Sequence, residues 1–175
     1  MIGNDIIDLQ ASRVESNWQR KGWLEKVFTT DEIALVSSGR FTDAATMVWL
    51  LWSMKEAAYK IWNRTTRLSR YSPKSFACSL FDDASCNGEV SFSDNLYFTN
   101  SFIGDDFIHT IATSTNNLTS PSVYLSTINS TDVLPPNITF FKDEYGMPFV
   151  MDKYTGAKNI ASNSHHGRFQ ALVYC

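Results

Sequence analysis

Charged residues interrupt an otherwise apolar run between residues 49 and 60. The run contains Lys55, Glu56 and Lys60, although ionised lysine and glutamate side chains are rarely buried without a partner. At about 100° per residue, one face of a helix, with Lys60 at its edge, would present Trp52, Lys55, Glu56, Tyr59 and Asn63. One acid between two cations on an aromatic wall fits a bound polyanion and a metal ion better than a plain core.

The same residues also allow simpler interpretations. Glu56 and Lys60 have the i,i+4 spacing of a pair that stabilises any exposed helix by about 0.2–0.5 kcal/mol. Lys55 alone can be a solvated lysine. Because Trp52 and Ala57 flank these charges, the segment is not expected to be freely exposed, and this favours the chemical interpretation.

The order of the flanking segments indicates an α+β fold. Helical spacing from 12 to 26 and a capped helix from about 30 to 36 precede a long helix from about 43 to 63. After Pro73 the pattern alternates, which predicts strands at 75–80, 90–92, 96–102, 107–112, 123–125, 138–141 and 171–174. Turns are expected at 86–89 and 145–149, and connecting segments at 116–121 and 129–136. Helices followed by strands predict a largely antiparallel sheet.

Composition narrows the class of protein. The chain has 175 residues, of which 43% are hydrophobic and 14% aromatic, and this predicts a single domain over residues 1–175 with its own core. The net charge of −3 argues against a nucleic-acid-binding protein, which needs a basic face. Asp5 stands where a signal peptide carries lysines, and no apolar run of membrane-spanning length follows. Three cysteines without metal-type spacing predict reduced thiols in a cytoplasmic protein.

Three segments together resemble the 4'-phosphopantetheinyl transferase superfamily. Residues 3–6, Gly-Asn-Asp-Ile, are similar to its Gly-x-Asp motif. Residues 28–32, Phe-Thr-Thr-Asp-Glu, and 52–60, Trp-Ser-Met-Lys-Glu-Ala-Ala-Tyr-Lys, resemble its Phe-(Ser/Thr)-x-x-Glu and Trp-Ser-x-Lys-Glu-(Ala/Ser)-x-x-Lys signature. Residues 162–165, Ser-Asn-Ser-His, resemble its Ser-x-Ser-His segment, and 146–148, Gly-Met-Pro, are similar to a Gly-Lys-Pro. The Trp-to-Lys signature is specific by itself, and the shorter motifs gain force from its company.

The order of these motifs is that of the small holo-acyl-carrier-protein synthases, which begin with Gly-x-Asp and end with Ser-His. Residues 68–113 nevertheless resemble the sheet of the second half of surfactin-type enzymes. The resemblance spans residues 3 to about 174, with 115–137 unplaced. It implies one transferase-like unit in which helices pack on a mainly antiparallel sheet.

The resemblance also implies an activity. Members of the family transfer 4'-phosphopantetheine from coenzyme A to a serine of an acyl or peptidyl carrier protein, as in fatty-acid or polyketide biosynthesis. Asp5 and Glu56 would ligate magnesium, and Glu56 would also accept the serine proton, with Lys60 as the second catalytic residue. The residues expected to contact the phosphates of coenzyme A are Lys55, Lys60, Ser164 and His165.

Two positions depart from the family pattern. Ile7 stands where surfactin-type enzymes carry a second acid, so a site with two carboxylates is expected. Met147 replaces the lysine of Gly-Lys-Pro. Residues that can supply the missing charge are Lys142, Lys153 and Arg168.

Other interpretations remain open at this point. Asp5 can cap a turn, and His165 can be an ordinary turn histidine. The second functional interpretation is a degenerate family member that binds coenzyme A or a carrier protein without transfer. The third is a structural or interaction protein whose aromatic helix is merely core.

Quaternary structure follows from the half-unit comparison. Surfactin-type enzymes form their coenzyme A site between two halves, so another copy would have to complete the site of a half-unit. We therefore expect a homo-oligomer, a trimer or a dimer, in which His165 faces Asp5 and Glu56 across the subunit boundary. The residues expected on the first helix to meet an acidic carrier protein are Arg13, Arg20, Lys21 and Lys26.

Overall fold

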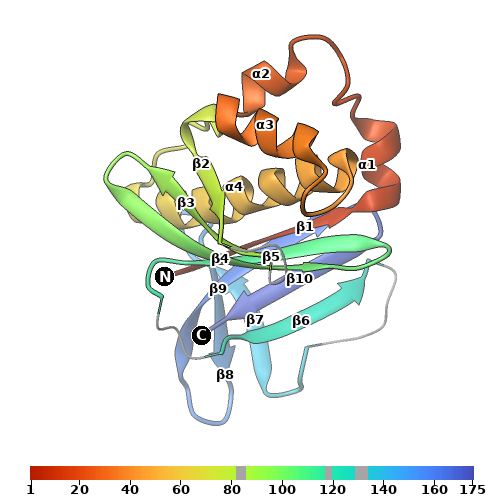
Figure 1. The fold of residues 1–175 in the computed structure, drawn as a ribbon. Coiled ribbons are helices and arrows are strands. Elements are labelled where there is room, and N and C mark those ends of the chain that lie inside the picture. The colour runs from red at the N-terminus through yellow and green to blue at the C-terminus, as the bar shows by residue number, and fades with distance from the viewer. Residues whose placement is uncertain (82–85, 117–119, 129–133) are drawn as a thin grey trace.

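A layer of helices and two antiparallel sheets build the chain (Figure 1). The computed structural model describes residues 1–81, 86–116, 120–128 and 134–175. The helices in this part are α1 (Leu9–Glu15), α2 (Trp23–Val27), α3 (Thr30–Ser38) and α4 (Ala44–Thr66), with a 3-10 turn η1 (Pro73–Ser75). The strands are β1 (Ile2–Asp8), β2 (Ala77–Leu80), β3 (Asn87–Phe92), β4 (Asn95–Ile103), β5 (Phe107–Thr113), β6 (Ser122–Thr127), β7 (Ile138–Lys142), β8 (Pro148–Asp152), β9 (Lys158–His166) and β10 (Phe169–Tyr174).

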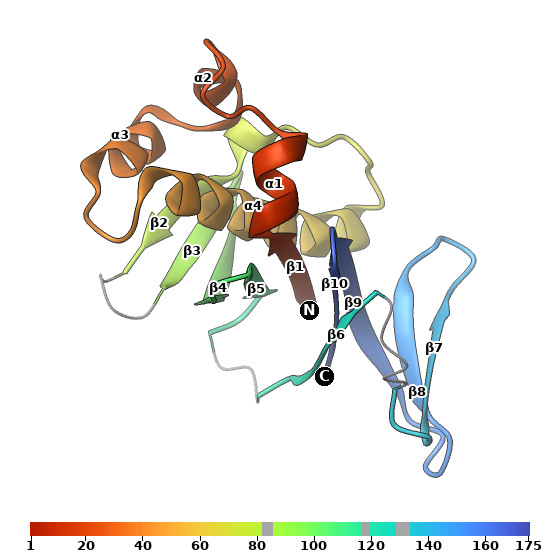
Figure 2. The same ribbon diagram turned by 90° about the vertical axis from the view of Figure 1, so that its right-hand side faces the viewer.

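Each sheet has five strands in the described part. The first has the order β1-β5-β4-β3-β2 and the second the order β6-β10-β9-β8-β7. All neighbouring pairs run antiparallel. The helices cover one face of the first sheet, and the second sheet lies on its other side (Figures 1 and 2). The expected α+β class with a mainly antiparallel sheet is confirmed.

Helix α4 forms the centre of the larger core. The Asp43 side chain caps it by accepting hydrogen bonds from the N–H groups of Ala45 and Thr46, and it ends at Arg67, whose φ is 59°. Its buried face, which includes Leu50, Leu51 and Met54, packs on the first sheet. Burial of each such side chain stabilises the fold by about 1.5–3 kcal/mol. The predicted helix over 43–63 is confirmed.

Helix α4 crosses β1 in very close contact at Gly3. A Cβ atom at Gly3 would lie 2.1 Å from the carbonyl oxygen of Ala57, closer than any real contact. Because strand side chains alternate, Asp5 lies on the same face as Gly3, toward α4, whereas Asn4 lies on the opposite face. The missing side chain of Gly3 therefore sets how closely Asp5 approaches the helix.

The segment over residues 12–26 is not the single helix that its spacing predicts. Helix α1 ends at Glu15, and α2 begins only at Trp23 after Gly22, whose φ of 80° is left-handed. A left-handed residue cannot continue a right-handed helix. Val14, expected on the apolar stripe, is 87% exposed. The prediction of one helix is therefore wrong.

The strands agree better with the sequence pattern. The predicted strands correspond to β2 through β7 and to β10. The predicted turn at 86–89 is wrong because β3 already begins at Asn87. Strands β8 and β9 were not expected. The connecting segments expected at 116–121 and 129–136 lie partly outside the described residues.

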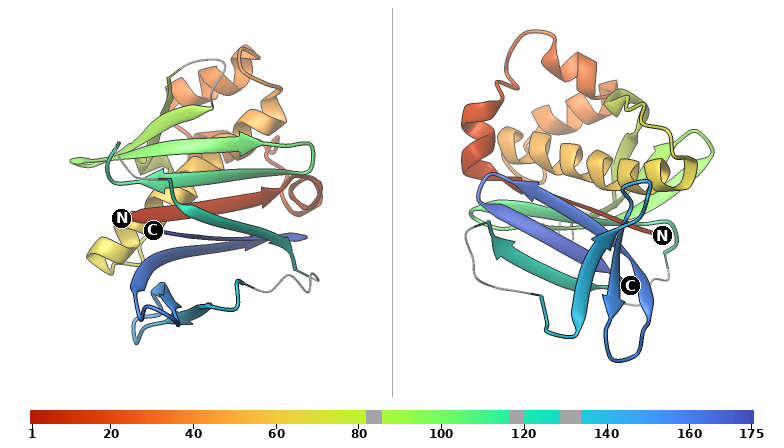
Figure 3. Two further views of the ribbon diagram at one scale, coloured as in Figure 1. Left: turned by 90° about the horizontal axis from the view of Figure 1, so that it is seen from below. Right: turned by 180° about the vertical axis from the view of Figure 1, so that it is seen from behind.

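Strand β1 is where the two sheets meet. It pairs with β5 over its whole length and packs against β9 and β10. Figure 3 shows β1, the edge strand of the first sheet, between β5 and the β9–β10 hairpin. Residues on β1 can therefore contact helix α4 on one face and the second sheet on the other.

None of the described helices is both long enough and apolar enough to cross a bilayer.

Candidate active site

Asp5 and Glu56 approach each other from β1 and α4. Asp5 is 9% exposed, and Glu56 is half-buried. The Nζ of Lys60 lies 3.4 Å from Oδ1 of Asp5 and 2.6 Å from the carbonyl oxygen of Asn4. The other oxygen of Asp5, Oδ2, is buried and has no hydrogen-bond partner among the described residues. The structure thus brings together three of the residues that the sequence singles out.

Burial raises the pKa of both carboxyl groups. The pKa of Glu56 rises to about 7, first because the group is buried and second because the charge of Asp5 opposes its ionisation, while Lys60 acts in the other direction. The pKa of Asp5 is also raised by burial, with Lys60 again opposing. Two ionised carboxylates facing one lysine would leave negative charge uncompensated. A bound cation would relieve this charge.

An aromatic wall covers Glu56. The ring centroids of Tyr71 and Trp52 lie 6.2 Å apart, and the ring centroids of Tyr71 and Tyr59 lie 4.4 Å apart. The hydroxyl of Tyr71 is buried without a hydrogen-bond partner in the described structure. Its burial and the nearby charge of Glu56 raise the pKa of that hydroxyl. This wall keeps water from one side of the carboxylate pair, which strengthens electrostatic interactions there.

Lys55 is not brought to this site. Its buried Nζ lies 2.8 and 2.9 Å from the two carboxylate oxygens of Glu32 and also donates to the carbonyl oxygens of Pro73, at 3.1 Å, and Phe76. An ammonium group has three protons, so all of them have partners. The geometry therefore does not support the expected contact of Lys55 with the phosphates of coenzyme A.

Glu32 explains why this lysine is buried. Its carboxylate also accepts hydrogen bonds from the backbone N–H groups of Thr29, at 2.7 Å, and Cys78, at 2.7 Å. Thr29 returns a bond to Glu32 in a capping box at the start of α3. The Phe-Thr-x-x-Glu segment and Lys55 therefore form one buried anchor that holds α3 and the start of β2 against α4.

The second sheet carries the Ser-x-Ser-His segment to β1. The Oγ atoms of Ser162 and Ser164 accept hydrogen bonds from Asn4, from its backbone N at 2.8 Å and its Nδ2 at 3.0 Å. Both serines are buried, whereas His165, which follows Ser164, points to the other face of β9 and is exposed. Ser164 is thus engaged with the protein itself, and His165 is open to a ligand.

A cavity of about 250 Å³ lies between the end of α4, β9 and the turn that joins β7 to β8. Lys60 and His165 line it together with residues 146–148, the Gly-Met-Pro segment. Three motifs that are far apart in the sequence therefore meet around one space. Lys60 connects this space to the carboxylates, because its Nζ also contacts Asp5.

Two further cations line the cavity. Of the three residues considered as substitutes for the missing lysine, Lys142 lines it, whereas Lys153 donates to the carbonyl oxygen of Pro136 and Arg168 binds elsewhere. Arg64 was not anticipated. Its guanidinium donates to the carbonyl oxygens of Pro148 and Ala161, at 2.7 and 2.6 Å, which ties the β7–β8 hairpin to α4. Its position four residues after Lys60 on the same helix was the available signal.

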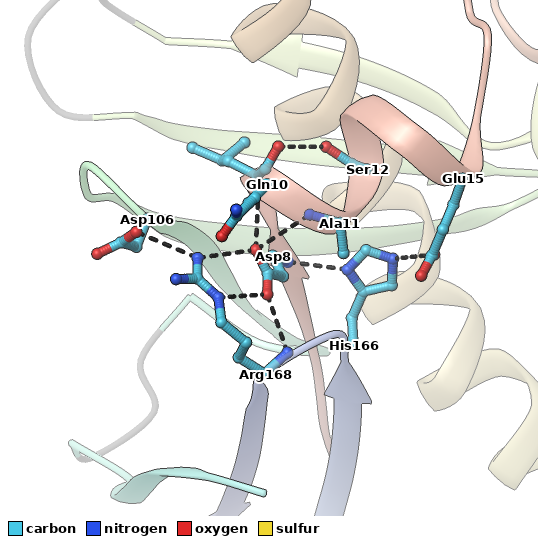
Figure 4. A network of polar contacts seen from close by, with 9 residues as sticks. Asp8, Gln10, Ala11, Ser12, Glu15, Asp106, His166 and Arg168 are labelled. Carbon is cyan, nitrogen blue, oxygen red and sulfur yellow. Dashed lines mark hydrogen bonds and ion pairs between the residues drawn. The ribbon is translucent and has the colours of Figure 1, made fainter.

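Asp8 fastens the β9–β10 turn to the end of β1 (Figure 4). Its carboxylate caps α1 through the N–H groups of Gln10 and Ala11. It also accepts from three nitrogens of Arg168, the backbone N at 2.9 Å, Nε at 2.8 Å and Nη2 at 3.0 Å. Arg168 is the main cause that holds the pKa of Asp8 far below its usual range. Arg168 is therefore an anchor rather than a substitute phosphate ligand.

His166 and Gly167 complete this attachment. The Nδ1 of His166 accepts from the backbone N–H of Asp8 at 2.9 Å, and its Nε2 lies 3.1 Å from Glu15 (Figure 4). A Cβ atom on Gly167, whose φ is 52°, would lie 2.5 Å from Oδ2 of Asp8. Since this turn immediately follows His165, the network fixes where β9 presents that residue.

One chain supplies all of these groups. His165 lines the same cavity as Lys60 of the same chain. The lining of this cavity therefore needs no second copy. The homo-oligomer, with His165 facing Asp5 and Glu56 across a subunit boundary, stays a prediction.

The carboxylates of Asp5 and Glu56 fit a divalent ion that takes its remaining ligands from substrate and water. Among the described residues, no three His, Cys, Asp or Glu side chains are grouped closely enough to hold a metal ion. Asp5 and Glu56 would give two carboxylate ligands, and the unpartnered Oδ2 of Asp5 is a ready donor. Magnesium is commonly bound in this way, by one or two carboxylates plus substrate phosphates and water.

A model of a known protein family matches residues 1–112, and the family is described as the 4'-phosphopantetheinyl transferase superfamily. The chain belongs to this superfamily. In this member of the superfamily, the matched residues cover the helices and nearly all of the first sheet, and they include Asp5, Glu56 and Lys60. The second sheet, with Ser164 and His165, lies beyond the matched residues, so its part in the site rests on the geometry above. A search among curated proteins found no match.

Proposed function

We propose that this chain transfers 4'-phosphopantetheine from coenzyme A to a serine hydroxyl of an acyl or peptidyl carrier protein and releases adenosine 3',5'-bisphosphate. The observation that carries the proposal is the buried pair of Asp5 and Glu56 beside a cavity lined by Lys60 and His165. The family match over residues 1–112 supports the same type of transfer. Residues 1–175 act as one unit in this proposal, because the hydrogen bonds of Asn4 and Asp8 connect the two sheets.

Asp5 and Glu56 would hold magnesium. When bound, the ion would supply Lewis-acid stabilisation of the diphosphate of coenzyme A. The carboxylates fit this role because both have a raised pKa and one oxygen of Asp5 has no partner among the described residues.

Glu56 is the proposed base. The serine oxygen forms a bond to the phosphorus that carries pantetheine, the bond from that phosphorus to the adenosine bisphosphate breaks, and the serine proton moves to Glu56. A general base works best when its pKa lies near the working pH, and the pKa of Glu56 is about 7. Lys60 offsets the negative charge that develops on the phosphate oxygens.

The cavity beside Lys60 is the proposed site for the nucleotide part of coenzyme A. Its charged lining includes Lys60, Arg64 and Lys142, and His165 offers a further donor on the opposite wall. Ser164 contributes by holding β9 in place, since its Oγ is buried against Asn4. Lys55 takes a structural role in this proposal.

A second candidate function is binding of coenzyme A or a carrier protein without transfer. Met147 favours it, because this neutral residue lines the cavity where the family motif has a lysine. Lys142 and Arg64 also line the cavity, and they favour retention of a phosphate ligand.

Mass spectrometry of an apo carrier protein separates these candidates. The protein is incubated with the carrier and coenzyme A, with and without magnesium. Addition of the phosphopantetheine mass only in the presence of magnesium supports transfer. Binding of coenzyme A in a titration calorimeter without any mass gain supports the second candidate. No transfer together with no binding of either coenzyme A or the carrier protein in the calorimeter would contradict both.

The carrier protein is proposed to dock near α1 and α2, because carrier helices are expected to be acidic. Four exposed cations lie here, although not on one helix as expected: Arg13 on α1, Arg20 and Lys21 in the connecting segment, and Lys26 on α2. We expect the double variant Arg20→Glu, Lys21→Glu to raise the KM for the carrier about threefold to tenfold and to leave the KM for coenzyme A unchanged, because rim charges act mainly on association. Unchanged kinetics with the carrier would remove these residues from the docking surface.

The proposed location is the cytoplasm, which the free thiols of Cys78 and Cys175 support. A trimer or dimer is not needed to line the cavity. Light scattering of the coenzyme A complex tests the predicted homo-oligomer, and a strict monomer that still binds coenzyme A would contradict it.

A further inference from the structure

Asn4 is the middle residue of the Gly-x-Asp segment, and the motif gives it no role. It is fully buried and lies on the face of β1 opposite to Asp5. Its backbone and side chain contact both β9 and α4, the elements that carry His165 and Lys60. This sets it apart from an ordinary core position.

The side chain of Asn4 joins β1 to the second sheet. Its Nδ2 donates to Oγ of Ser164 at 3.0 Å and to the carbonyl oxygen of Ala171 at 3.2 Å. It also lies 3.3 Å from Nε2 of His109. Burial lowers the pKa of His109 to about 4, with a smaller effect from Lys60, so the ring is neutral and can accept a hydrogen bond there. Three acceptors on three strands therefore share the two protons of one amide nitrogen.

The backbone of Asn4 makes two more contacts. Its N–H donates to Oγ of Ser162 at 2.8 Å, and its carbonyl oxygen accepts from Nζ of Lys60 at 2.6 Å. Lys60 is therefore held at once by the backbone of Asn4 and the carboxylate of the next residue, Asp5. The same residue thus fixes β9 on one side and a phosphate-facing lysine on the other.

We propose that Asn4 is a positioning residue for coenzyme A: its amide and backbone hold the strand of Ser164 and His165, and the ammonium of Lys60, at set places relative to Asp5. This inference rests on the proposed function. An apolar side chain at this position would leave Oγ of Ser164 and the carbonyl oxygen of Ala171 buried without this donor, and β9 would shift to find water or another partner. Asn4 itself touches neither the reacting phosphorus nor the proposed metal.

The test compares Asn4→Ala with Ser101→Ala. Ser101 also makes a buried hydrogen bond, to Thr110 at 2.8 Å, but it lies on β4 away from the cavity. Both variants are expected to lose similar thermal stability. Only Asn4→Ala is expected to raise the KM and Kd for coenzyme A, by about tenfold, the effect of one lost hydrogen bond of ordinary strength. The KM for the carrier protein should stay within twofold in both variants.

Hydrogen exchange gives a readout independent of turnover. Amides of residues 161–166 should exchange faster in Asn4→Ala and keep their wild-type rates in Ser101→Ala. If Asn4→Ala does not fold, Ser162→Ala removes the acceptor of the Asn4 N–H without changing Asn4, and a threefold or larger rise in the Kd for coenzyme A is expected.

The outcomes separate the two proposals. Equal and unchanged affinity for coenzyme A in Asn4→Ala and Ser101→Ala, or in Ser162→Ala where that variant is needed, overturns the positioning role while leaving the proposed function intact. A wild-type protein that binds no coenzyme A contradicts the proposed function, and the positioning role with it.

Discussion

Helix α4 carries two lysines, Lys55 and Lys60, and each pairs with a carboxylate from another element. The two pairs differ in whether all of their polar atoms have hydrogen-bond partners. Lys55 and Glu32 are almost completely buried, 2.8 Å apart, and every proton of the lysine has an acceptor. Lys60 and Asp5 are partly open, 3.4 Å apart, and Asp5 keeps one buried oxygen without a partner among the described residues. Native proteins rarely leave a buried polar atom unpaired without a reason. Incomplete satisfaction, rather than burial of charge, therefore marks the functional pair.

The largest expected effect is loss of transfer on changing Glu56, the carboxylate that lies beside the Lys60–Asp5 pair. Glu56→Gln removes the proposed base and one metal ligand but keeps the size of the side chain. Transfer should fall about 10²–10⁴-fold, and the free energy of unfolding should stay the same or rise, because a buried charge is removed. Steady-state kinetics and urea unfolding measure the two quantities. Near wild-type turnover would contradict the role of Glu56.

The buried Lys55–Glu32 pair should respond in the opposite way, with a loss of stability when it is broken. Lys55→Met leaves Glu32 as a buried charge without its partner, and breaking such a pair costs about 3–5 kcal/mol of stability. Lys60→Met should cost under about 1 kcal/mol, as for exposed pairs, yet it should weaken binding of coenzyme A. Urea unfolding and calorimetric titration of both variants test the contrast. Equal losses of stability would remove the distinction between the pairs.

Glu56, beside the Lys60–Asp5 pair, also predicts a pH dependence of stability. Because burial raises the pKa of Glu56 from 4.5 to about 7, the folded state binds more protons than the unfolded state between these pH values. The stabilisation from Glu56 is then full below about pH 4.5 and is lost as the pH rises through about 7, by at most about 3 kcal/mol. Urea unfolding at pH 5 and pH 8 should show this loss in the wild type and a smaller one in Glu56→Gln. Parallel profiles would show that Glu56 does not titrate in this range.

The smallest change in the series tests how closely β1 approaches α4, which sets the distance between Asp5 and Lys60. Gly3→Ala places a methyl group against the carbonyl oxygen of Ala57 and must push α4 away from β1. We expect a loss of about 1–3 kcal/mol, as for other overpacked cores, together with weaker magnesium binding. Gly22→Ala is the control, since nothing lies within 4 Å of its Cβ position, and it should affect stability through its left-handed backbone alone. Unchanged magnesium affinity in Gly3→Ala would separate the helix approach from the metal site.

Much of the fold was predictable where one local signal dominates. The cap at Asp43 and the apolar face of α4 fixed that helix, and alternation identified most strands. The prediction for residues 12–26 failed because the helical spacing conceals two breaks: the backbone is extended at Ser16, after α1, and left-handed at Gly22, before α2. Strand β9 failed because its small and polar residues, such as Ser162 and Asn163, do not alternate in hydrophobicity. Ser162 is buried because it faces β1, whose position no local pattern encodes.

The sequence indicated several residues of the candidate site, but it did not indicate which residues each of them contacts. The structure brings together Asp5, Glu56 and Lys60, which the family motifs group; helix periodicity indicated only Glu56 and Lys60. The sequence could not tell Lys55 from Lys60, since the difference lies in Glu32 and in the carbonyl oxygens of Pro73 and Phe76. Nor could it reveal that Asp8 and Arg168 join distant segments, because each is an ordinary surface charge when read alone.

The bonds between β1 and the β9–β10 hairpin have a consequence for the timing of folding. Asn4 and Ser162 are separated by 158 positions, and closing so long a loop is slow compared with forming a helix. The helices and the first sheet can assemble while the ribosome is still making the second. A nascent chain would therefore acquire its acidic pair early and its phosphate-facing wall last, and premature release would yield a folded fragment that lacks the groups proposed to grip the nucleotide.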